Sequence, residues 1–199
     1  MARKPATDAQ RQAARRTLQK AAAGLYAEAG AAGVSARAIA QRAGVSVGTI
    51  YAYFGSLQGL MQSLWREPVE VINQQLAELA AGIEDPVGRL RALLNAYVEV
   101  ALTRPELFRG AFLFVRPETL PKPEREPLEG TPFAALLASA IREGQARGIM
   151  RDGAPGELAQ MAWAGVHGCL ALPVNFDRLD FAEPSTLASQ MIDILIVDL

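Results

Sequence analysis

Apolar residues recur every three or four positions along most of the chain, which is the spacing of one face of an α-helix. No stretch alternates apolar and polar residues as a half-buried strand does, so the pattern predicts an all-α fold. We expect about nine helices: residues 8–30, two short helices within 35–54, and then 56–81, 86–103, 105–115, 131–147, 155–172 and 184–199.

A tight turn joins the two short helices of residues 35–54. Ser35 and Ser46 each stand where a helix begins, and a serine oxygen can accept the free amide hydrogens of a helix start. Gly44 stands between the helices, where the chain needs left-handed backbone to leave the first one. A helix–turn–helix of this kind places its second helix in the DNA major groove. The outer side of that helix carries Val47, Thr49, Tyr51 and Tyr53.

Prolines interrupt the helical pattern further along the chain. Pro68 lies inside the 56–81 stretch, where it removes one backbone hydrogen bond. It either kinks one long helix or separates two helices. Residues 116–130 contain four prolines and mixed charges, so we expect a loop there. Pro173 is expected to end the 155–172 helix.

The helix over residues 155–172 is apolar on two opposite faces, so both faces must be buried. The last helix is also apolar over most of its girth. Such a pair favours a four-helix interface with a second copy of the chain, although burial within one chain would also satisfy the pattern. The residues assigned to this homodimer interface are Leu158, Ala162, Gly165, Cys169, Leu187, Met191 and Ile194.

Half of the 199 residues are hydrophobic, which is enough to bury a sizeable core. No run of about 18 apolar residues could cross a membrane, and the N-terminus lacks the apolar segment of a signal peptide. A single cysteine, Cys169, excludes an internal disulfide. We therefore expect a cytoplasmic protein that does not bind membranes.

The net charge of −1 is unevenly distributed. Residues 1–60 contain eight basic and two acidic residues, a net charge of +6, whereas the remaining residues carry −7. This asymmetry favours a cationic N-terminal part that meets phosphate. A solvated helix surface would show the same excess of basic residues.

The stretch IAQRAGVSVGTIYAYF, residues 39–54, resembles the helix–turn–helix of the TetR family of bacterial regulators, whose pattern is IA..AGVS.GT.Y.YF. The basic helix before it and the long helix after it also agree with that family. A second likeness lies at MAWAGVHGCLAL, residues 161–172. It resembles the Trp–x–x–x–His–Gly signature of one C-terminal domain type of the family, with Trp163, His167 and Gly168 at the matching positions.

The resemblance implies a homodimeric repressor that binds a palindromic operator in double-stranded DNA and is released by a small-molecule effector. Carried over by position, the DNA contacts come from Ser35, Arg37, Val47, Gly48, Thr49, Tyr51 and Tyr53. Ser46 and the amides at its helix start can bind a phosphate. We expect one of the two tyrosines to be partly buried. Leu57 stands where the family usually has a lysine, which removes a phosphate contact.

Aromatic and polar-tipped residues of the C-terminal half are candidates for a mostly apolar ligand pocket. The residues are Tyr97, Phe108, Phe112, Trp163 and His167, and each of them could instead belong to the core. His167 is the only histidine, and a lone histidine is commonly a hydrogen-bonded core residue. No cofactor or metal is expected.

The sequence lacks metal-ligand spacing, a phosphate-binding loop and a nucleophile elbow, so we do not expect an enzyme. A DNA-binding activator or structural protein without ligand control is the remaining alternative. The large apolar body argues against it, because that body exceeds what DNA docking needs. We expect two domains, a DNA-binding domain over residues 1–55 and a ligand-binding and dimerisation domain over residues 56–199.

Overall fold

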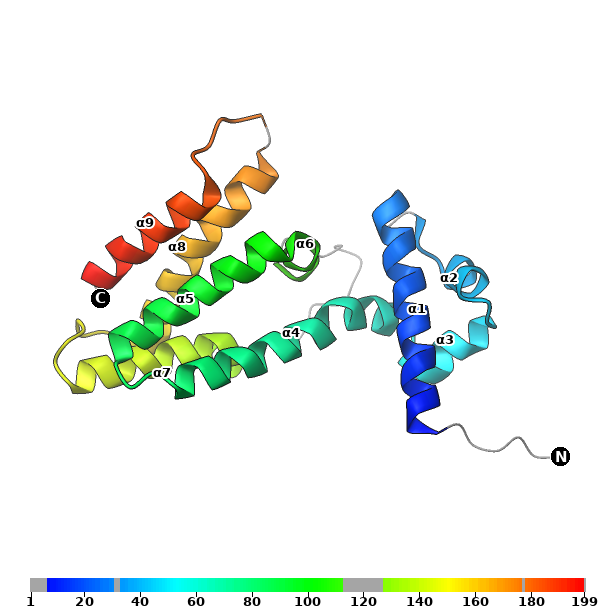
Figure 1. The fold of residues 1–199 in the computed structure, drawn as a ribbon, viewed down its shortest axis with the longest axis horizontal. Helices are drawn as coiled ribbons and strands as arrows, with labels where there is room; N and C mark the ends of the chain where they lie inside the picture. Colours follow the sequence, from blue (N-terminus) through cyan, green and yellow to red (C-terminus); the bar gives the residue numbers. More distant parts are fainter. Residues whose placement is uncertain (1–6, 31–32, 113–126, 177, 199) are drawn as a thin grey trace. The chain divides into compact units, whose positions relative to one another are not determined.

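The structure, a computed structural model, describes residues 7–30, 33–112, 127–176 and 178–198. Within these ranges the chain forms nine α-helices and one short 3-10 helix and contains no strand, which confirms the all-α prediction (Figure 1). The elements are α1 (Asp8–Ala29), α2 (Ala36–Ala43), α3 (Val47–Phe54), α4 (Leu57–Ala81), α5 (Pro86–Thr103), α6 (Pro105–Phe112), η2 (Leu128–Gly130), α7 (Pro132–Ala146), α8 (Pro155–Asn175) and α9 (Pro184–Asp198).

The chain divides into two compact units, residues 1–68 and 69–199, which we call the N-terminal and C-terminal units. The division falls inside α4, directly after Pro68, and therefore later than the domain boundary expected after residue 55. The reason is that the first half of α4 belongs to the N-terminal core, to which it contributes the fully buried Leu60. Pro68 does not separate two helices, because α4 is one helix over Leu57–Ala81.

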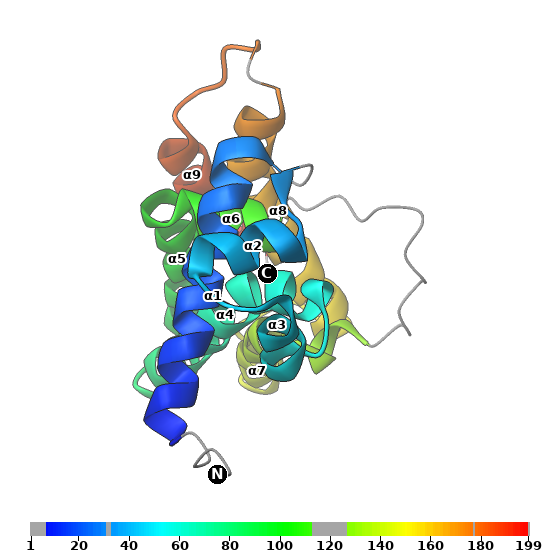
Figure 2. The same cartoon turned by 90° about the vertical axis from the view of Figure 1, so that its right-hand side faces the viewer.

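The N-terminal unit is built on α1, against which α2 and α3 pack (Figure 2). Leu18, Ile39 and Ile50, one from each of the three helices, are almost completely buried. Ser35 caps α2 as predicted, since its Oγ accepts a hydrogen bond from the Ala38 amide at 3.1 Å. Gly44 ends α2 with φ of 67°, a left-handed conformation that a side chain would disfavour.

The predicted side-chain cap at Ser46 is wrong. Ser46 does precede α3 with extended backbone, but its hydroxyl makes no hydrogen bond to a backbone amide of the helix. Its Oγ instead lies 2.9 Å from the Thr49 Oγ1. The two hydroxyls hydrogen-bond to one another, so the Ser46 side chain satisfies none of the free backbone amides at the start of α3.

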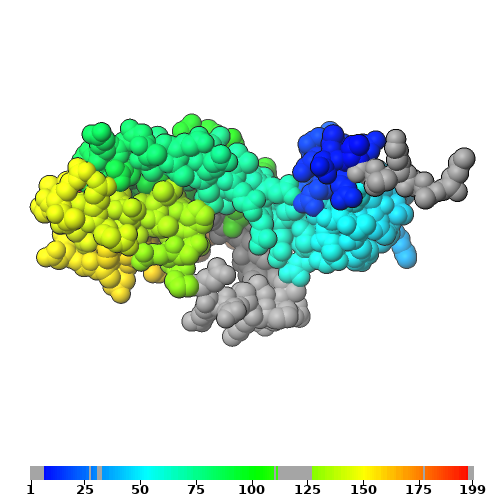
Figure 3. Space-filling view, turned by 90° about the horizontal axis from the view of Figure 1, so that it is seen from below, coloured from blue at the N-terminus to red at the C-terminus, as the bar shows by residue number. Residues whose placement is uncertain are grey.

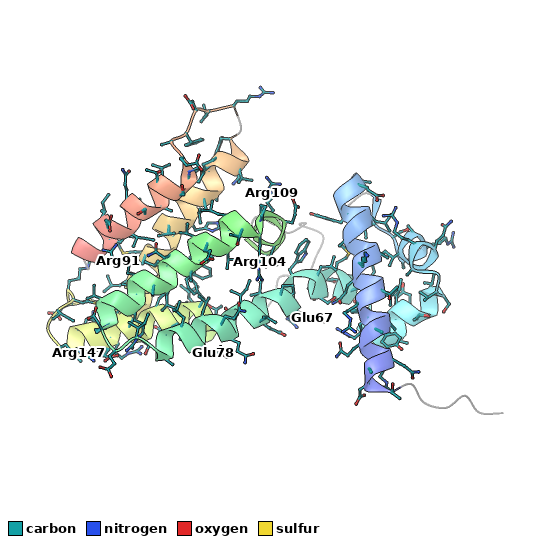
Figure 4. The ribbon with its side chains drawn as sticks, in the orientation of Figure 1. Glu67, Glu78, Arg91, Arg104, Arg109 and Arg147 are labelled. Atoms are coloured by element: carbon teal, nitrogen blue, oxygen red, sulfur yellow. The ribbon has the colours of Figure 1, made fainter. Side chains whose placement is uncertain are left out.

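The C-terminal unit packs α5 against α7, α8 against α7, and α9 against α8. Its core contains Leu90, Leu94, Leu137, Ile141 and Val166, all fully buried. Ion pairs also join its helices, as between Arg89 of α5 and Glu143 of α7 at 2.7 Å. Arg91 of α5, labelled in Figure 4, pairs with Asp193 of α9.

Two details of this unit differ from the sequence-based expectation. The α8 helix continues through Pro173 to Asn175, so this proline removes its own backbone hydrogen bond without ending the helix. The Phe176 amide then donates to the Leu172 carbonyl at 2.9 Å and closes the helix. Most of the loop expected over residues 116–130 lies outside the described residues, and its end forms η2.

Candidate functional site

The candidate DNA-contacting residues lie on α2, on α3 and at the starts of these helices. Ser35, Arg37, Ser46 and Gly48 are exposed, and the exposed fraction of Tyr51 is 50%. Thr49 is half-buried and bonded to Ser46. These short or aromatic side chains can offer methyl contacts and single hydrogen bonds to base edges, and Arg37 alone among them has a fork-shaped donor.

Three of the residues around α3 have packing roles. Val47, Tyr53 and Leu57 are half-buried against the core of the N-terminal unit. The expectation that one of the two tyrosines is partly buried is therefore met by Tyr53. Leu57, at the position where the family pattern suggests a lysine, packs against this core.

Only part of the basic charge of the N-terminal unit is available to a ligand. Arg42 donates two hydrogen bonds to the Glu28 carboxylate, at 2.8 and 2.7 Å, which lowers the pKa of Glu28. Arg15 is engaged by Glu67 at 2.6 Å. The remaining basic residues of α1 and α2 are exposed: Arg11, Arg16, Lys20 and Arg37.

The C-terminal unit contains an apolar cavity of about 260 Å³. Two of the elements that line the cavity are α7 and the second half of α4. Figure 3 shows the face of this unit on which both of them reach the surface. The described residues that line the cavity include no charged side chain; they are Val69, Ile72, Asn73, Leu76, Tyr97, Val100, Leu107, Thr131, Pro132, Phe133 and Trp163. Such a lining favours the uncharged, apolar part of a ligand.

An aromatic cluster forms one wall of the cavity. The ring of Tyr97 stacks on Phe133, with centroids 5.3 Å apart, and Trp163 meets both rings edge-on at 6.0 and 5.4 Å. The Tyr97 hydroxyl lies 2.7 Å from His167 Nδ1. Burial raises the pKa of Tyr97 and lowers that of His167, so at neutral pH the phenol is protonated and the imidazole neutral. The phenol can therefore donate this hydrogen bond to Nδ1.

The structure brings together some of the predicted ligand-binding residues. Tyr97 and Trp163 line the cavity, whereas Phe108 and His167 are not among its lining residues. Phe108 is buried and meets the His167 ring at a centroid distance of 5.4 Å, so both support Tyr97. Phe112 lies in α6, but its side chain is outside the described part of the structure.

Sequence reasoning missed the contribution of α4 to the cavity. Val69, Ile72, Asn73 and Leu76 recur at helical spacing on its second half and line one side. The apolar spacing of Val69, Ile72 and Leu76 can be seen in the sequence, but a helix packed on a core and a helix packed over a cavity show the same spacing.

The predicted dimer-interface residues mostly face the chain's own core. The prediction is wrong for Leu158 and Ala162, which are 3% and 0% exposed and cannot contribute area to an interface. Gly165 packs toward α9, since an added Cβ would lie 3.3 Å from the Met191 sulfur. Cys169, Leu187 and Met191 are half-buried, and Ile194 is 57% exposed.

A different face of α8 is exposed and apolar. It carries the exposed Met161, Ala164 and Leu172 and the half-buried Gly168, spaced three or four residues apart, and we call it the exposed α8 face. Met161 and Leu172 are 55% and 45% exposed, and a Cβ added to Gly168 would meet no atom of the described residues within 4 Å. An apolar helix face of this kind is typical of an interface.

Family models match both units of the chain. Residues 18–64 match the model described as bacterial regulatory proteins, tetR family, and residues 90–195 match a tetracyclin repressor-like C-terminal domain. The second match alone spans more than half of the chain and includes the Trp163, His167 and Gly168 positions. The chain belongs to the TetR family of bacterial transcriptional regulators.

Relatives of this TetR-family regulator agree with that assignment. The HTH-type transcriptional regulator BetI 1 of Chromohalobacter salexigens is 31% identical over 113 residues, which cover 48% of this chain and 56% of the relative. The chain thus aligns with little more than half of the length of that curated relative.

Solved structures share the fold over nearly the whole chain. FadR of Bacillus subtilis, in complex with stearoyl-CoA, has a TM-score of 0.73 and 19% identity, and the match covers 92% of this chain and 98% of that chain. A protein of unknown function from Rhodococcus sp. RHA1 has a TM-score of 0.72 and 26% identity, over 94% and 95% of the two chains. FadR of Thermus thermophilus, in complex with lauroyl-CoA, has a TM-score of 0.64 and 16% identity, over 93% and 94%.

The described residues of this TetR-family chain show no feature of a metal site or of a membrane span. They contain no group of three or more His, Cys, Asp or Glu side chains placed to hold a metal ion. No helix among them is long and apolar enough to cross a membrane.

Proposed function

We propose that this TetR-family regulator is a homodimeric, cytoplasmic repressor, released from a palindromic operator by a small, mostly apolar ligand. The observation that carries the proposal is the apolar cavity of the C-terminal unit, whose wall includes the second half of α4. The first half of the same helix is part of the N-terminal core. A ligand that displaces Val69, Ile72 or Leu76 therefore acts on the helix to which the DNA-binding elements are attached.

A fatty acyl chain is the ligand class that the cavity favours. The described part of the lining offers aliphatic and aromatic contact and no charge, which disfavours a charged head group inside the cavity. Two proteins of the same fold, the FadR regulators of Bacillus subtilis and Thermus thermophilus, are in complex with stearoyl-CoA and lauroyl-CoA. The cavity of about 260 Å³ is close to the lower limit of about 300 Å³ for ligand pockets, which favours a chain of moderate length.

The homodimer is proposed to form through the exposed α8 face together with Ile194 of α9. Both surfaces are apolar and are left uncovered by the chain's own helices. Two such helices from each of two copies would form a four-helix interface around a two-fold axis. The two copies of α3, the recognition helix of each protomer, would then enter successive major grooves about 34–36 Å apart. Because the dimer has two-fold symmetry, the DNA that fits it is a palindrome.

Selection of bound sequences from random double-stranded DNA tests this function. The full-length protein is expected to enrich a palindrome whose half-sites lie one helical turn, or a multiple of it, apart. Recovery of random sequences, or of a single unrepeated half-site, would contradict the proposal. A protein that enriches a palindrome but ignores acyl ligands would instead be a DNA-binding protein without this ligand control.

A further inference from the structure

Arg15 of α1 bonds to two other helices of the N-terminal unit. Its Nη1 donates to the main-chain carbonyl of Tyr53 at 2.8 Å, and its Nη2 donates to Glu67 Oε1 at 2.6 Å. The guanidinium also lies over the Phe54 ring, 4.4 Å from its centroid. One side chain of α1 is thus joined both to the end of α3 and to α4.

The carbonyl that Arg15 contacts belongs to the last turn of α3. The final four carbonyls of a helix have no partner within it, and the negative end of the helix dipole lies there. The last turn of α3 contains no basic residue of its own, and the Gly55 amide satisfies only the Tyr51 carbonyl. Arg15 supplies from α1 the donor and the positive charge that this helix end needs.

Glu67 fixes the orientation of Arg15. Its second oxygen, Oε2, accepts a hydrogen bond from Gln19 Nε2 at 2.8 Å. Gln19 is held in turn by the buried Ser63, whose Oγ lies 3.0 Å away and donates to the Leu60 carbonyl at 2.7 Å. Partial burial opposes ionisation of Glu67, but the hydrogen bonds from Gln19 and Arg15 outweigh it and lower its pKa. The carboxylate, labelled on α4 in Figure 4, is therefore charged at neutral pH.

We propose that Arg15 is a positioning residue for DNA recognition: it caps the C-terminal end of the recognition helix α3, and Glu67 of α4 holds it in place. The inference rests on the proposed DNA-binding function and adds to it the residue pair that sets the position of α3. Thr49 and Tyr51 would contact DNA, whereas Arg15 acts on them only through the helix end.

The competing interpretation is that Arg15 itself binds a DNA phosphate. Arg15 and Glu67 border an open hollow of about 750 Å³, and their side chains are 29% and 44% exposed, so a phosphate could approach them. The two interpretations predict opposite effects of neutralising Glu67. Freeing a phosphate-binding arginine and removing a negative charge would tighten DNA binding, whereas releasing a positioning arginine would weaken it.

The test compares Glu67→Gln, Arg15→Lys and the control Arg16→Gln in the full-length protein, by fluorescence anisotropy with the selected palindrome and a scrambled duplex over a range of salt concentrations. Glu67→Gln is expected to lower affinity for the palindrome about tenfold and to leave the dependence of log affinity on log salt unchanged. Arg15→Lys keeps the charge but cannot bond Tyr53 and Glu67 with one rigid fork, so a similar loss is expected. Arg16 is an exposed neighbour of Arg15, so Arg16→Gln should lower the affinity for the palindrome and for the scrambled duplex by the same factor.

Amide hydrogen exchange in the free protein tests the cap without DNA. Glu67→Gln should speed exchange of the Phe54 and Gly55 amides at the end of α3, and leave the Val45 amide at the end of α2 unchanged. Unchanged exchange at α3, or palindrome binding by Glu67→Gln as tight as in the wild type or tighter, would overturn the inference. If Glu67→Gln proves unfolded, Arg15→Lys decides by the same readouts. A wild-type protein that selects no sequence would contradict the proposed function, while the exchange result would still decide whether Arg15 caps α3.

Discussion

Ser35 and Ser46 hold the same position before the two helices of the motif and use their hydroxyls differently. Ser35 accepts from the Ala38 amide at 3.1 Å, whereas Ser46 pairs with the Thr49 hydroxyl at 2.9 Å. Only the first of these bonds satisfies a free donor of the helix start. The Thr49 side chain is thereby held at the start of α3, among the residues expected to read bases.

Ser35→Ala should therefore destabilise the N-terminal unit by about 1 kcal/mol, since it removes a helix cap. Ser46→Ala is the matched control and should cost less than about 0.5 kcal/mol. Urea unfolding followed by Trp65 fluorescence in a Trp163→Phe background reports on this unit, because Trp65 packs edge-on against Tyr26 within it. Equal losses in the two variants would show that the two serines contribute alike.

For single residues, the sequence predicts those caps, turns and buried positions that depend on residues nearby in the chain. The cap at Ser35, the left-handed turn at Gly44 and the buried Ile39 and Ile50 all follow from residue type and spacing. Arg15 does not, because its partners Tyr53 and Glu67 are far away in sequence and no local pattern marks them. The choice of Ser46 between an amide and a hydroxyl also depends on a rotamer that the sequence does not specify.

The α8 helix shows what periodicity can and cannot decide about an element. Apolar spacing correctly predicts a helix with two apolar sides, but the rotation of the helix is set by the helices packed against it. In the structure Leu158 and Ala162 face the core, Gly165 faces α9, and the face that includes Gly168 is left open. The interface prediction therefore moves to the exposed α8 face.

Gly168→Glu should convert the homodimer into a monomer, because it buries a charge at the centre of the proposed interface. A Cβ built at Gly168 would meet no described atom within 4 Å, and glutamate favours helix more than glycine does. Sedimentation velocity checks the result, with Ala77→Glu at an exposed position of α4 as the control that adds the same charge. A dimeric Gly168→Glu variant, or a monomeric wild type, would contradict the proposed interface.

In the whole molecule, the excess of positive charge lies in the N-terminal unit and the apolar cavity lies in the C-terminal unit. Residues 1–68 contain nine basic and three acidic residues, and residues 69–199 contain eleven basic and eighteen acidic ones, so the units carry +6 and −7. The first can approach DNA, whereas the second is repelled by phosphate and contains the apolar cavity. Only α4 belongs to both units, with Leu60 in one core and Leu76 lining the cavity of the other. Ligand control of DNA binding is thus proposed to depend on filling that cavity.

The most direct test of that claim is whether lauroyl-CoA releases the selected palindrome from the protein. Fluorescence anisotropy of the labelled DNA measures this release for the wild type, Val100→Phe and Leu102→Phe. Val100 lines the cavity, and a larger side chain there takes up the space for the acyl chain. Leu102, two residues away on α5, is 45% exposed and does not line it. Lauroyl-CoA should release DNA from the wild type and from Leu102→Phe at similar concentrations, and Val100→Phe should need about tenfold more. No release from the wild type, or a Val100→Phe variant that responds like it, would contradict control through this cavity.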